Sequence, residues 1–208
     1  MYDLSDFRKN YSGKRLDIEK LPSHPLDLFN IWFDEAIKNE DGEANAVIVS
    51  TVDSFNKPHS RVVLLKGFSN EGFVFFTNYL SSKGRQIENN ACVALLFFWQ
   101  KLQRQVRIEG ITQKISTRQS EEYFSSRPLE SQFAAMASKQ SERLLNRKEL
   151  LDRYEQIKKE NKPKRPEYWG GYIVVPNYFE FWQGQANRLH DRVVYKLEQT
   201  WEKHLLYP

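Results

Sequence analysis

The sequence has a single cysteine, no long hydrophobic run and few histidines. Because Cys92 stands alone among 208 residues, neither an intrachain disulfide nor a cysteine zinc site can form. The longest uninterrupted apolar run, residues 91–99, is far shorter than the roughly 20 residues that span a bilayer. Residues 1–10 also lack the apolar segment of a signal peptide. We therefore expect a soluble, cytoplasmic protein with no membrane partner.

Several large enzyme classes lose support because their motifs are missing. The chain contains no GxGxxG, GxxxxGKS, HExxH, CxxC or GxSxG segment. Its four histidines are scattered without the short spacing of metal ligands, so we expect no metal site. The net charge of +4 is compatible with nucleic acid, with an acidic ligand or with ordinary surface charge.

The pattern of apolar residues predicts a mixture of helices and strands. Helical spacing predicts an amphipathic helix at residues 25–39 and further helices at 81–90, around Tyr123 and at 141–159. Ser116 and Gln119 have capping-box spacing before the Tyr123 helix, which Pro128 should end or kink. Runs rich in β-branched and aromatic residues predict strands at 46–52, 60–68, 73–77, 91–99, 103–114, 170–175, 178–182, 192–197 and 201–206.

Strands joined by hairpin-length links, with helices inserted between them, favour an α+β protein. We expect an antiparallel sheet that is closed or nearly closed. Residues 1–22 are basic and poor in apolar side chains, so we predict a flexible N-terminal arm followed by a single domain at 23–208.

Cations occur where strands or helices begin and end. Arg61 and Lys66 are five residues apart on a predicted strand, which should point them to opposite faces and toward different groups, unless both simply snorkel from an exposed edge. Ser81, Ser82 and Lys83 open a helix, an arrangement that suits a bound phosphate as well as simple N-capping.

Two further clusters combine cations with hydrogen-bond donors. Tyr123 and Arg127 share one helix face and Ser131 follows closely, which suits a phosphate or, alternatively, a surface Tyr–Arg pair. The segment 188–192, RLHDR, packs two guanidiniums, an imidazole and a carboxylate into five residues. On an alternating backbone Arg188, His190 and Arg192 would share a face toward one ligand, the alternative being a salt-bridged loop.

Taken together, these segments resemble the pyridoxine (pyridoxamine) 5'-phosphate oxidases, which are flavin enzymes. The resemblance runs from near the N-terminus to the end of the chain. It is carried by RVVLLK (61–66), FTN (76–78), QIENN (86–90), RQVRIEG (104–110), YFSSRPLESQ (123–132), SKQS (138–141), WGGY (169–172), FWQG (181–184) and RLHDR (188–192).

The resemblance implies an FMN-binding split β-barrel of antiparallel, Greek-key type with flanking helices. It also implies a homodimer with two FMN molecules in clefts between the subunits. The implied reaction oxidises pyridoxamine or pyridoxine 5'-phosphate to pyridoxal 5'-phosphate, with O2 as acceptor and H2O2 as product.

The family's functional residues carry over position by position. The implied cofactor-binding residues are Arg61, Val62, Val63, Leu64, Leu65, Lys66, Phe76, Thr77, Ser82, Lys83, Gln105, Gln140, Ser141, Trp182 and Arg192. The implied substrate-binding residues are Lys66, Tyr123, Arg127, Ser131, Arg188 and His190, with Arg8 and Tyr11 on an arm that closes over the pocket. Arg188 and His190 are the expected catalytic pair, which orients the pyridine ring and its phenolic oxygen.

Three positions depart from the family pattern, and two other functions compete. Phe76 and Ser82 stand where the family usually has tyrosine and arginine, so FMN should bind more weakly, and Leu205 replaces an arginine near the end. One alternative keeps the flavin split barrel but changes the substrate, as in phenazine-pathway oxidases or flavin reductases. The other is a basic module that binds nucleic acid, but the cations are dispersed among apolar strands rather than clustered.

Overall fold

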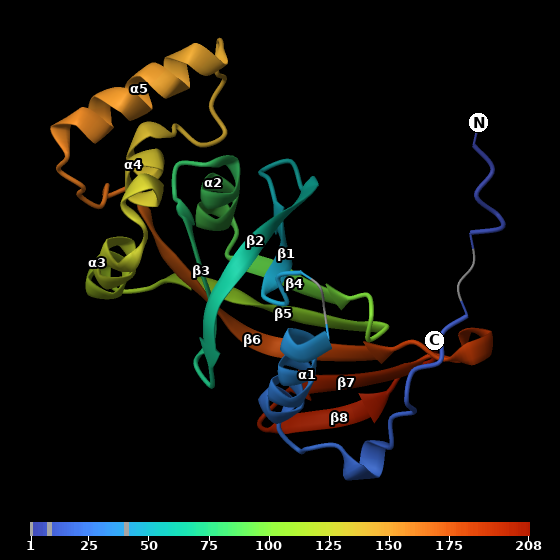
Figure 1. Cartoon of the computed structure of the whole chain (residues 1–208). Helices are drawn as coiled ribbons and strands as arrows, with labels where there is room; N and C mark the ends of the chain where they lie inside the picture. The colour runs from blue at the N-terminus through green and yellow to red at the C-terminus, as the bar shows by residue number, and fades with distance from the viewer. Residues whose placement is uncertain (1, 8–9, 40–41) are drawn as a thin grey trace. The chain divides into compact units, whose positions relative to one another are not determined.

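The computed structural model describes residues 2–7, 10–39 and 42–208 (Figure 1). The chain divides into two compact units: unit 1 spans residues 1–49, 94–110 and 176–208, and unit 2 spans residues 50–93 and 111–175. The division into an arm at 1–22 and a single domain at 23–208 stays a prediction.

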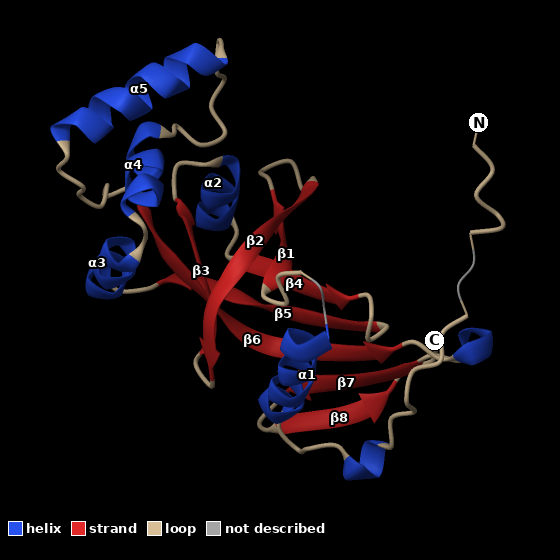
Figure 2. Ribbon diagram, in the orientation of Figure 1, coloured by secondary structure: helices blue, strands red, loops and turns tan. Residues whose placement is uncertain are grey.

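In the part of the chain that the structure describes, eight strands form one sheet in the order β3-β2-β1-β4-β5-β6-β7-β8 (Figure 2). Their bounds are β1 (Ala46–Val52), β2 (Pro58–Ser69), β3 (Gly72–Asn78), β4 (Cys92–Trp99), β5 (Arg104–Lys114), β6 (Trp169–Gln183), β7 (Asp191–Leu197) and β8 (Trp201–Leu205). The pairs β2–β3, β3–β6, β6–β7 and β7–β8 are antiparallel. Because β3 also pairs with β6, hydrogen bonding returns from the sixth strand to the start of the sheet. The prediction of an α+β protein with an antiparallel, closed or nearly closed sheet is confirmed.

The described residues also form five α-helices and two short 3-10 turns. The helices are α1 (Pro25–Asn39), α2 (Ser82–Asn89), α3 (Thr117–Ser126), α4 (Leu129–Ala137) and α5 (Arg147–Glu160), and the turns are η1 (Ile18–Lys20) and η2 (Ala186–Arg188). The predicted capping box is present, since the Ser116 hydroxyl accepts from the Gln119 backbone N–H and the Gln119 amide oxygen accepts from the Ser116 N–H. The bounds of α1 agree with its helical periodicity.

The helix predicted at 141–159 begins six residues later than expected. Asn146 caps α5 by accepting a hydrogen bond of 3.0 Å from the Glu149 backbone N–H. Ser141 has a left-handed backbone with φ of 73°, which a right-handed helix cannot contain. The local backbone therefore shortens the helix, and Ser141 becomes part of a loop.

The remaining differences from the predicted helices and strands occur at two prolines. Pro128 ends α3 as predicted, but it also precedes α4, a helix that the sequence analysis missed and that Figure 1 shows beside α5. The strands predicted at 170–175 and 178–182 are one continuous strand, β6, which runs through Pro176. Pro176 falls between the residues that pair with β3 and those that pair with β7, so its missing N–H breaks neither ladder.

The core of unit 1 forms where α1 packs on the sheet. The Phe29 ring lies 5.2 Å from that of Phe97 on β4, and the Trp32 ring lies 5.2 Å edge-on from that of Phe181 on β6. Complete burial of a side chain such as Phe29 contributes about 1.5–3 kcal/mol to stability.

The segment before α1 is fastened to the last two strands of unit 1. The ammonium of Lys203 on β8 donates to the backbone carbonyls of Ile18 and Leu21, at 2.8 and 2.7 Å. The Tyr195 hydroxyl on β7 donates to the Pro22 carbonyl at 2.8 Å. These bonds fix the base of the predicted arm.

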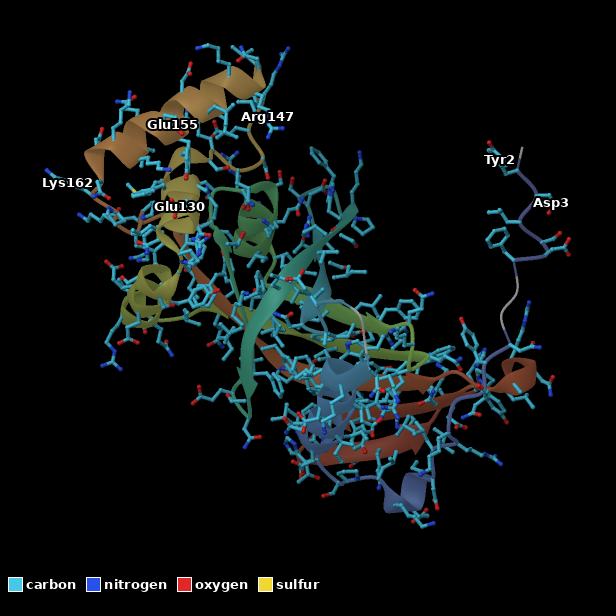
Figure 3. The ribbon with its side chains drawn as sticks, in the orientation of Figure 1. Tyr2, Asp3, Glu130, Arg147, Glu155 and Lys162 are labelled. Atoms are coloured by element: carbon cyan, nitrogen blue, oxygen red, sulfur yellow. The ribbon has the colours of Figure 1, made fainter. Side chains whose placement is uncertain are left out.

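In unit 2 the helices differ in how many of their side chains are buried. Phe124 of α3 is buried against Trp169, with its ring 5.2 Å away and nearly perpendicular. Helix α5 has no buried residue, and Arg147 and Glu155 on it are exposed (Figure 3). Helix α5 therefore adds little to the core of unit 2.

Candidate active site

Unit 2 contains a cavity of about 670 Å³, a size typical of small-molecule binding sites. Strands β2 and β3, the N-terminus of α2, the end of α3, the start of β6 and the segment 135–141 supply its walls. The lining residues are Arg61, Val62, Val63, Leu64, Lys66, Phe76, Thr77, Asn78, Ser82, Lys83, Tyr123, Arg127, Ala135, Ser138, Gln140, Ser141 and Trp169.

Lys83 brings a buried positive charge to this cavity from the first turn of α2. Its ammonium donates to the Thr77 hydroxyl at 2.9 Å, the Gln140 amide oxygen at 3.1 Å and the Ser81 hydroxyl at 3.3 Å. Burial, and then the charge of Arg61, lowers the pKa of Lys83 to about 8. All three acceptors are neutral, and no carboxylate of the described residues forms an ion pair with this lysine. An anion in the cavity would therefore stabilise the charged form.

The N-terminus of α2 reaches the cavity because two residues shape it. Ser81 caps the helix by accepting from the Gly84 backbone N–H. A Cβ at Gly84 would lie 2.0 Å from the Tyr79 carbonyl oxygen, so only glycine allows this close approach. The first backbone N–H groups of a helix have no partners inside it and favour anions, and Ser82 and Lys83 lie in this first turn.

Arg61 on β2 is held in place by two polar side chains. Its Nη1 donates to the Thr51 hydroxyl at 2.6 Å, and its Nη2 donates to the Gln86 amide oxygen at 3.2 Å. The Thr51 hydroxyl in turn donates to the same Gln86 oxygen at 2.6 Å. Burial lowers the pKa of Arg61, which lines the cavity together with Lys83.

Arg61 and Lys66 line the same cavity, although regular strand alternation predicts opposite faces for them. The register of β2 against β3 shifts between Leu65 and Gly67. Such a bulge adds a residue to one strand and turns the side chains beyond it. Val62, Val63 and Leu64 between them also line the cavity, so residues from both faces of β2 contribute to it. That Arg61 and Lys66 point to opposite faces stays a prediction.

Aromatic rings and one guanidinium form another wall. The Phe76 ring stacks on that of Tyr123 at 3.8 Å and on that of Trp169 at 5.5 Å. The guanidinium of Arg127 lies over the Trp169 ring at 4.8 Å. Its Nη1 is buried and has no hydrogen-bond partner in the described part of the chain, and burial lowers the pKa of Arg127. Arg127 as a residue lines the cavity, and its positive charge suits a negatively charged ligand there.

Unit 1 holds a second set of predicted residues, arranged around His190. Its ring lies 4.6 Å from the Trp182 ring and 5.7 Å from the Tyr11 ring. The Gln185 backbone N–H donates to Nδ1 of His190 at 3.0 Å. Because Nδ1 accepts, the proton of the neutral imidazole is on Nε2, which can donate to a ligand.

Backbone contacts hold the arm residue Tyr11 next to this histidine. The Gly13 N–H donates to the Gly184 carbonyl at 3.1 Å. The Leu16 N–H donates to the Asp191 carboxylate at 2.8 Å, and the side chain of Gln185 donates to the same oxygen at 2.9 Å. Asp191 thus joins the arm to the loop before β7.

Arg188 lies in a turn rather than in a strand. Asn187 and Arg188 both have left-handed backbones, with φ of 55° and 61°, and β7 begins at Asp191. The prediction that Arg188, His190 and Arg192 alternate along one strand face is therefore wrong. Left-handed conformations at non-glycine residues cost about 1–3 kcal/mol each and cluster at functional sites.

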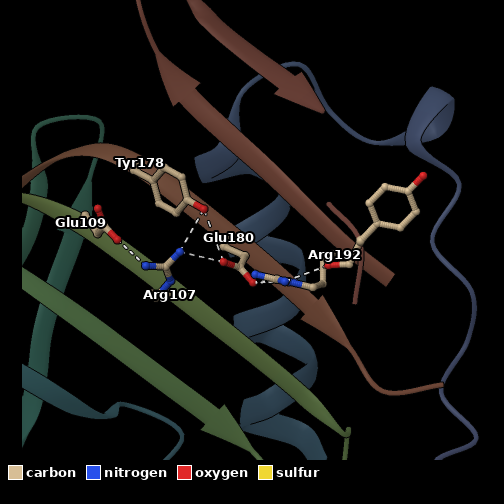
Figure 4. Close-up of polar contacts among 6 residues, drawn as sticks. Arg107, Glu109, Tyr178, Glu180 and Arg192 are labelled. Carbon is tan, nitrogen blue, oxygen red and sulfur yellow. Dashed lines mark hydrogen bonds and ion pairs between the residues drawn. The ribbon is translucent and has the colours of Figure 1, made fainter. Parts of the chain in front are cut away.

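Arg192 belongs to a polar network in unit 1 (Figure 4). Its Nε donates to the Glu180 carboxylate and its Nη1 to the Tyr207 carbonyl, both at 2.8 Å. Arg107 donates to the other Glu180 oxygen at 2.8 Å and also pairs with Glu109. Burial acts to raise the pKa of Glu180, but hydrogen bonds and charges from both guanidiniums outweigh it, so the pKa lies below its ordinary value.

The structure gathers one part of the predicted site in the cavity and places the other part in unit 1. The predicted residues around the cavity are Arg61, Val62, Val63, Leu64, Lys66, Phe76, Thr77, Ser82, Lys83, Tyr123, Arg127, Gln140 and Ser141. Those in unit 1 are Tyr11, Gln105, Trp182, Arg188, His190 and Arg192. Leu65 is buried in unit 2 without lining the cavity, Ser131 lies in α4 outside the lining set, and Arg8 lies outside the described residues.

Sequence reasoning missed several residues that shape the site. Trp169 appears in the WGGY segment, but nothing in its spacing marks it as a wall of the cavity. Thr51 and Gln86 support Arg61, and Glu180 supports Arg192. A polar residue inside an otherwise apolar strand, such as Thr51 or Glu180, is the signal that could have found them.

Every helix among the described residues is too short or too polar to span a bilayer. Within the same ranges, no three His, Cys, Asp or Glu side chains cluster as metal ligands.

The donor set of the cavity fits a phosphorylated ligand. Lys83 and Arg61 offer charge beside a helix N-terminus, and Arg127 offers an unpaired nitrogen. The groups of FMN and of a phosphorylated pyridine that would need charged donors are their phosphates. Lys83, Arg61 and the first turn of α2 are suited to one phosphate, and Lys66, Tyr123 and Arg127 to another.

Comparison with known proteins gives two family matches that together span most of the chain. A model described as pyridoxamine 5'-phosphate oxidase matches residues 33–161. A model described as the pyridoxine 5'-phosphate oxidase C-terminal dimerisation region matches residues 169–208.

Individual relatives are similar over their full length. The chain is 47% identical to pyridoxine/pyridoxamine 5'-phosphate oxidase of Chromohalobacter salexigens, covering 100% of this chain and 99% of that protein. It is 46% identical to the protein of the same name from Legionella pneumophila, covering 99% and 97%.

Two solved structures share the split-barrel fold that the resemblance implied. PhzG from Burkholderia lata, in complex with tetrahydrophenazine-1-carboxylic acid, has a TM-score of 0.88 at 25% identity, covering 95% of this chain and all of that one. A pyridoxamine 5'-phosphate oxidase-related, FMN binding protein from Nostoc punctiforme has a TM-score of 0.67 at 13% identity, covering 90% and 98%. The second likeness is one of fold alone.

Proposed function

The chain belongs to the pyridoxamine 5'-phosphate oxidase family, and we propose that it is an FMN-dependent oxidase that forms pyridoxal 5'-phosphate. Its substrates in this proposal are pyridoxamine 5'-phosphate and pyridoxine 5'-phosphate. When bound, FMN supplies an acceptor for a hydride from the substrate C4' carbon, and O2 takes up the two electrons and two protons as H2O2. The amine substrate also consumes one water and releases ammonia.

The observation that carries the proposal is the buried charge of Lys83. Three neutral acceptors hold its ammonium in a cavity that Arg61 also lines, at the N-terminus of a helix. We assign this corner to the FMN phosphate, because a dianion there would compensate both cations and would also accept from the first N–H groups of α2. Gln140 and Ser141, from the opposite loop, would complete the corner.

Lys66, Tyr123, Arg127 and Ser131 form the proposed anchor for the substrate phosphate. The first three line the cavity, and Nη1 of Arg127 lacks a partner among the described residues. A guanidinium can bind two phosphate oxygens at once, which would fix the substrate by the end remote from its reacting carbon. Holding that carbon against the flavin is the main catalytic task of the protein, because the reaction requires no nucleophilic side chain.

Arg188 and His190 are the proposed partners of the pyridine ring. The Nδ1 atom of His190 is occupied by the Gln185 N–H, so its Nε2–H would donate to the phenolic oxygen of the substrate. The left-handed turn leaves the Arg188 side chain exposed, and thus available to a ligand. Tyr11, and Arg8 on the same arm, are proposed to close over the bound substrate.

We also propose that the active form is a homodimer with its FMN sites at the subunit interface. The match of residues 169–208 to a family dimerisation region supports this assembly. Trp182, Arg188, His190 and Arg192 all lie within that region. Dimerisation and completion of the site would therefore depend on the same part of the chain.

A related split-barrel oxidase with another substrate is the second candidate. The structural likeness to PhzG, whose ligand is a tetrahydrophenazine carboxylic acid, favours it. The joint presence of Tyr123, Arg127, Arg188 and His190, which the resemblance assigns to a phosphorylated substrate, speaks against it. The two candidates differ in whether the substrate carries a phosphate, and this is open to a direct test.

The test measures the formation of pyridoxal 5'-phosphate and of H2O2 in the same reaction, with the purified, FMN-loaded protein. We expect equal amounts of pyridoxal 5'-phosphate and H2O2 from pyridoxamine 5'-phosphate, and little turnover of unphosphorylated pyridoxamine at the same concentration. Turnover of tetrahydrophenazine-1-carboxylic acid without turnover of either vitamer phosphate would favour the second candidate. Failure to take up FMN would contradict both.

A further inference from the structure

Arg127 is an unusual buried cation because an aromatic face supports it. It is the C-cap residue of α3, directly before Pro128. Its guanidinium lies 4.8 Å from the Trp169 ring and 5.9 Å from the Phe124 ring. Across the residues that the structure describes, it forms no ion pair with a carboxylate, and its buried Nη1 donates to no partner.

Trp169 is held rigidly from several sides. It is 7% exposed, and its backbone N–H donates to the Pro166 carbonyl at 2.9 Å. The Phe76 ring lies nearly parallel to its ring at 5.5 Å, and the Phe124 ring meets it edge-on at 5.2 Å. As the first residue of β6, Trp169 also pairs with Asn78 of β3. Its ring therefore offers a fixed surface at the cavity wall.

We propose that Trp169 is a positioning residue that holds the Arg127 guanidinium ready for the phosphate of the substrate. The inference rests on the proposed function, and it adds a residue that the sequence resemblance did not place in the site. The electron-rich face of an indole attracts a guanidinium without occupying its N–H bonds. All donors that face the cavity thus stay available to the oxygens of the ligand.

A carboxylate in the place of Trp169 would act differently. It would hold Arg127 more strongly, but it would neutralise the charge and occupy the donors that the phosphate needs. The ring lets the arginine stay buried, charged and unpaired until an anion binds. Within the described ranges, Arg127 accordingly lines the cavity with a guanidinium that rests on the Trp169 ring and pairs with no carboxylate.

The experiment measures the steady-state constants of the FMN-loaded enzyme and its inhibition by inorganic phosphate. Trp169→Leu should raise KM for pyridoxamine 5'-phosphate and Ki for phosphate about 3- to 30-fold, the range expected for a desolvated cation–π contact, with kcat within about 2-fold. Trp169→Phe keeps a smaller aromatic face, so its KM and Ki should lie between those of the wild type and those of Trp169→Leu. Trp99→Leu, which removes a buried tryptophan on β4 outside residues 169–208, should change neither constant.

A double-mutant cycle separates positioning from general destabilisation. In an Arg127→Met background, Trp169→Leu should raise Ki for phosphate by less than 2-fold, because the ring then has no guanidinium to hold. An equal effect with and without Arg127, or no effect of Trp169→Leu on Ki in the wild-type background, would overturn the proposal. If Trp169→Leu does not fold, Trp169→Phe carries the same comparison.

The phosphate measurement also distinguishes this inference from the proposed function. If the wild-type protein binds FMN but oxidises neither vitamer phosphate, the proposed function fails. Calorimetric titration of the same FMN-loaded variants with inorganic phosphate still tests the coupling between Trp169 and Arg127. Weaker phosphate binding in Trp169→Leu supports the inference, and unchanged binding contradicts it.

Discussion

The ammonium of Lys83 donates a hydrogen bond of 2.9 Å to the hydroxyl of Thr77, which joins the first turn of α2 to the end of β3. Neither group brings a negative charge, so the bond fixes the position of the lysine without neutralising it. The free energy of binding an anion here should therefore depend strongly on Lys83.

Replacement of Lys83 by methionine should weaken FMN binding about 10- to 100-fold, because a buried charge-assisted hydrogen bond to the phosphate is lost. Quenching of flavin fluorescence on titration of the apoprotein measures the dissociation constant. Lys38→Met, which removes an exposed lysine at the end of α1, is the control and should leave the constant unchanged. Equal affinities for wild type and Lys83→Met would remove Lys83 from the cofactor site.

The pKa of Lys83, lowered to about 8 by burial and by Arg61, predicts how this affinity changes with pH. The phosphate favours the protonated amine, so binding should be tightest below pH 8 and should weaken as the pH rises through that value. FMN dissociation constants at pH 7 and pH 9 give the comparison. In Lys83→Met the FMN dissociation constant should change little between pH 7 and pH 9. If this variant kept the pH dependence of the wild type, another group would be its cause.

His190 has two nitrogens with different expected roles, and two substitutions separate them. His190→Asn keeps an acceptor near the Gln185 N–H but loses the donor at Nε2, whereas His190→Gln can place a donor near the Nε2 position. We expect His190→Gln to retain more turnover, with His190→Asn reduced about 10- to 100-fold in kcat/KM. Both should keep FMN. A higher rate for His190→Asn would contradict the assignment.

Glu180 should stabilise the fold in a pH-dependent way. Its pKa is lowered in the native state, so its contribution is present above the unfolded value of about 4.5 and is lost as the pH falls through the native value. Glu180→Gln should lower the free energy of unfolding by about 1–3 kcal/mol at neutral pH, because two guanidiniums lose their shared partner. The difference should shrink toward pH 3 in urea denaturation.

The matched control for this change is Glu109→Gln. Glu109 also pairs with Arg107, but its side chain is 44% exposed while that of Glu180 is 4% exposed. Exposed pairs contribute about 0–1 kcal/mol, so the control should be nearly neutral. Equal losses in both variants would argue against burial as the cause.

The sequence predicted the elements whose signals are local. Helix α1 and the capping box of Ser116 and Gln119 depend on residues within a few positions of one another, and both appear as expected. Helix α5 began late because Ser141 takes a left-handed backbone that its residue type does not require. Continuity of β6 through Pro176 depends on which strands lie beside it, and this information is absent from a local window.

In the candidate site, too, features that depend on contacts between distant residues could not be predicted from the sequence. Lys83, Arg127 and many of the other residues that the resemblance implied line one cavity, and their ligand roles stay predictions. The resemblance could not show the bulge of β2 between Leu65 and Gly67, because a bulge is a property of two paired strands. Supports such as Trp169 and Glu180 were also missed, since they act through contacts between residues far apart in the chain.

One anaerobic titration shows whether the bound flavin accepts electrons from the proposed substrate. The purified protein, loaded with FMN and freed of oxygen, is mixed with pyridoxamine 5'-phosphate while its visible flavin absorbance is recorded. We predict that the absorbance bleaches with one equivalent of substrate per bound flavin and returns when air is admitted. Bound flavin that stays oxidised with both pyridoxamine and pyridoxine 5'-phosphate would contradict the proposed oxidase.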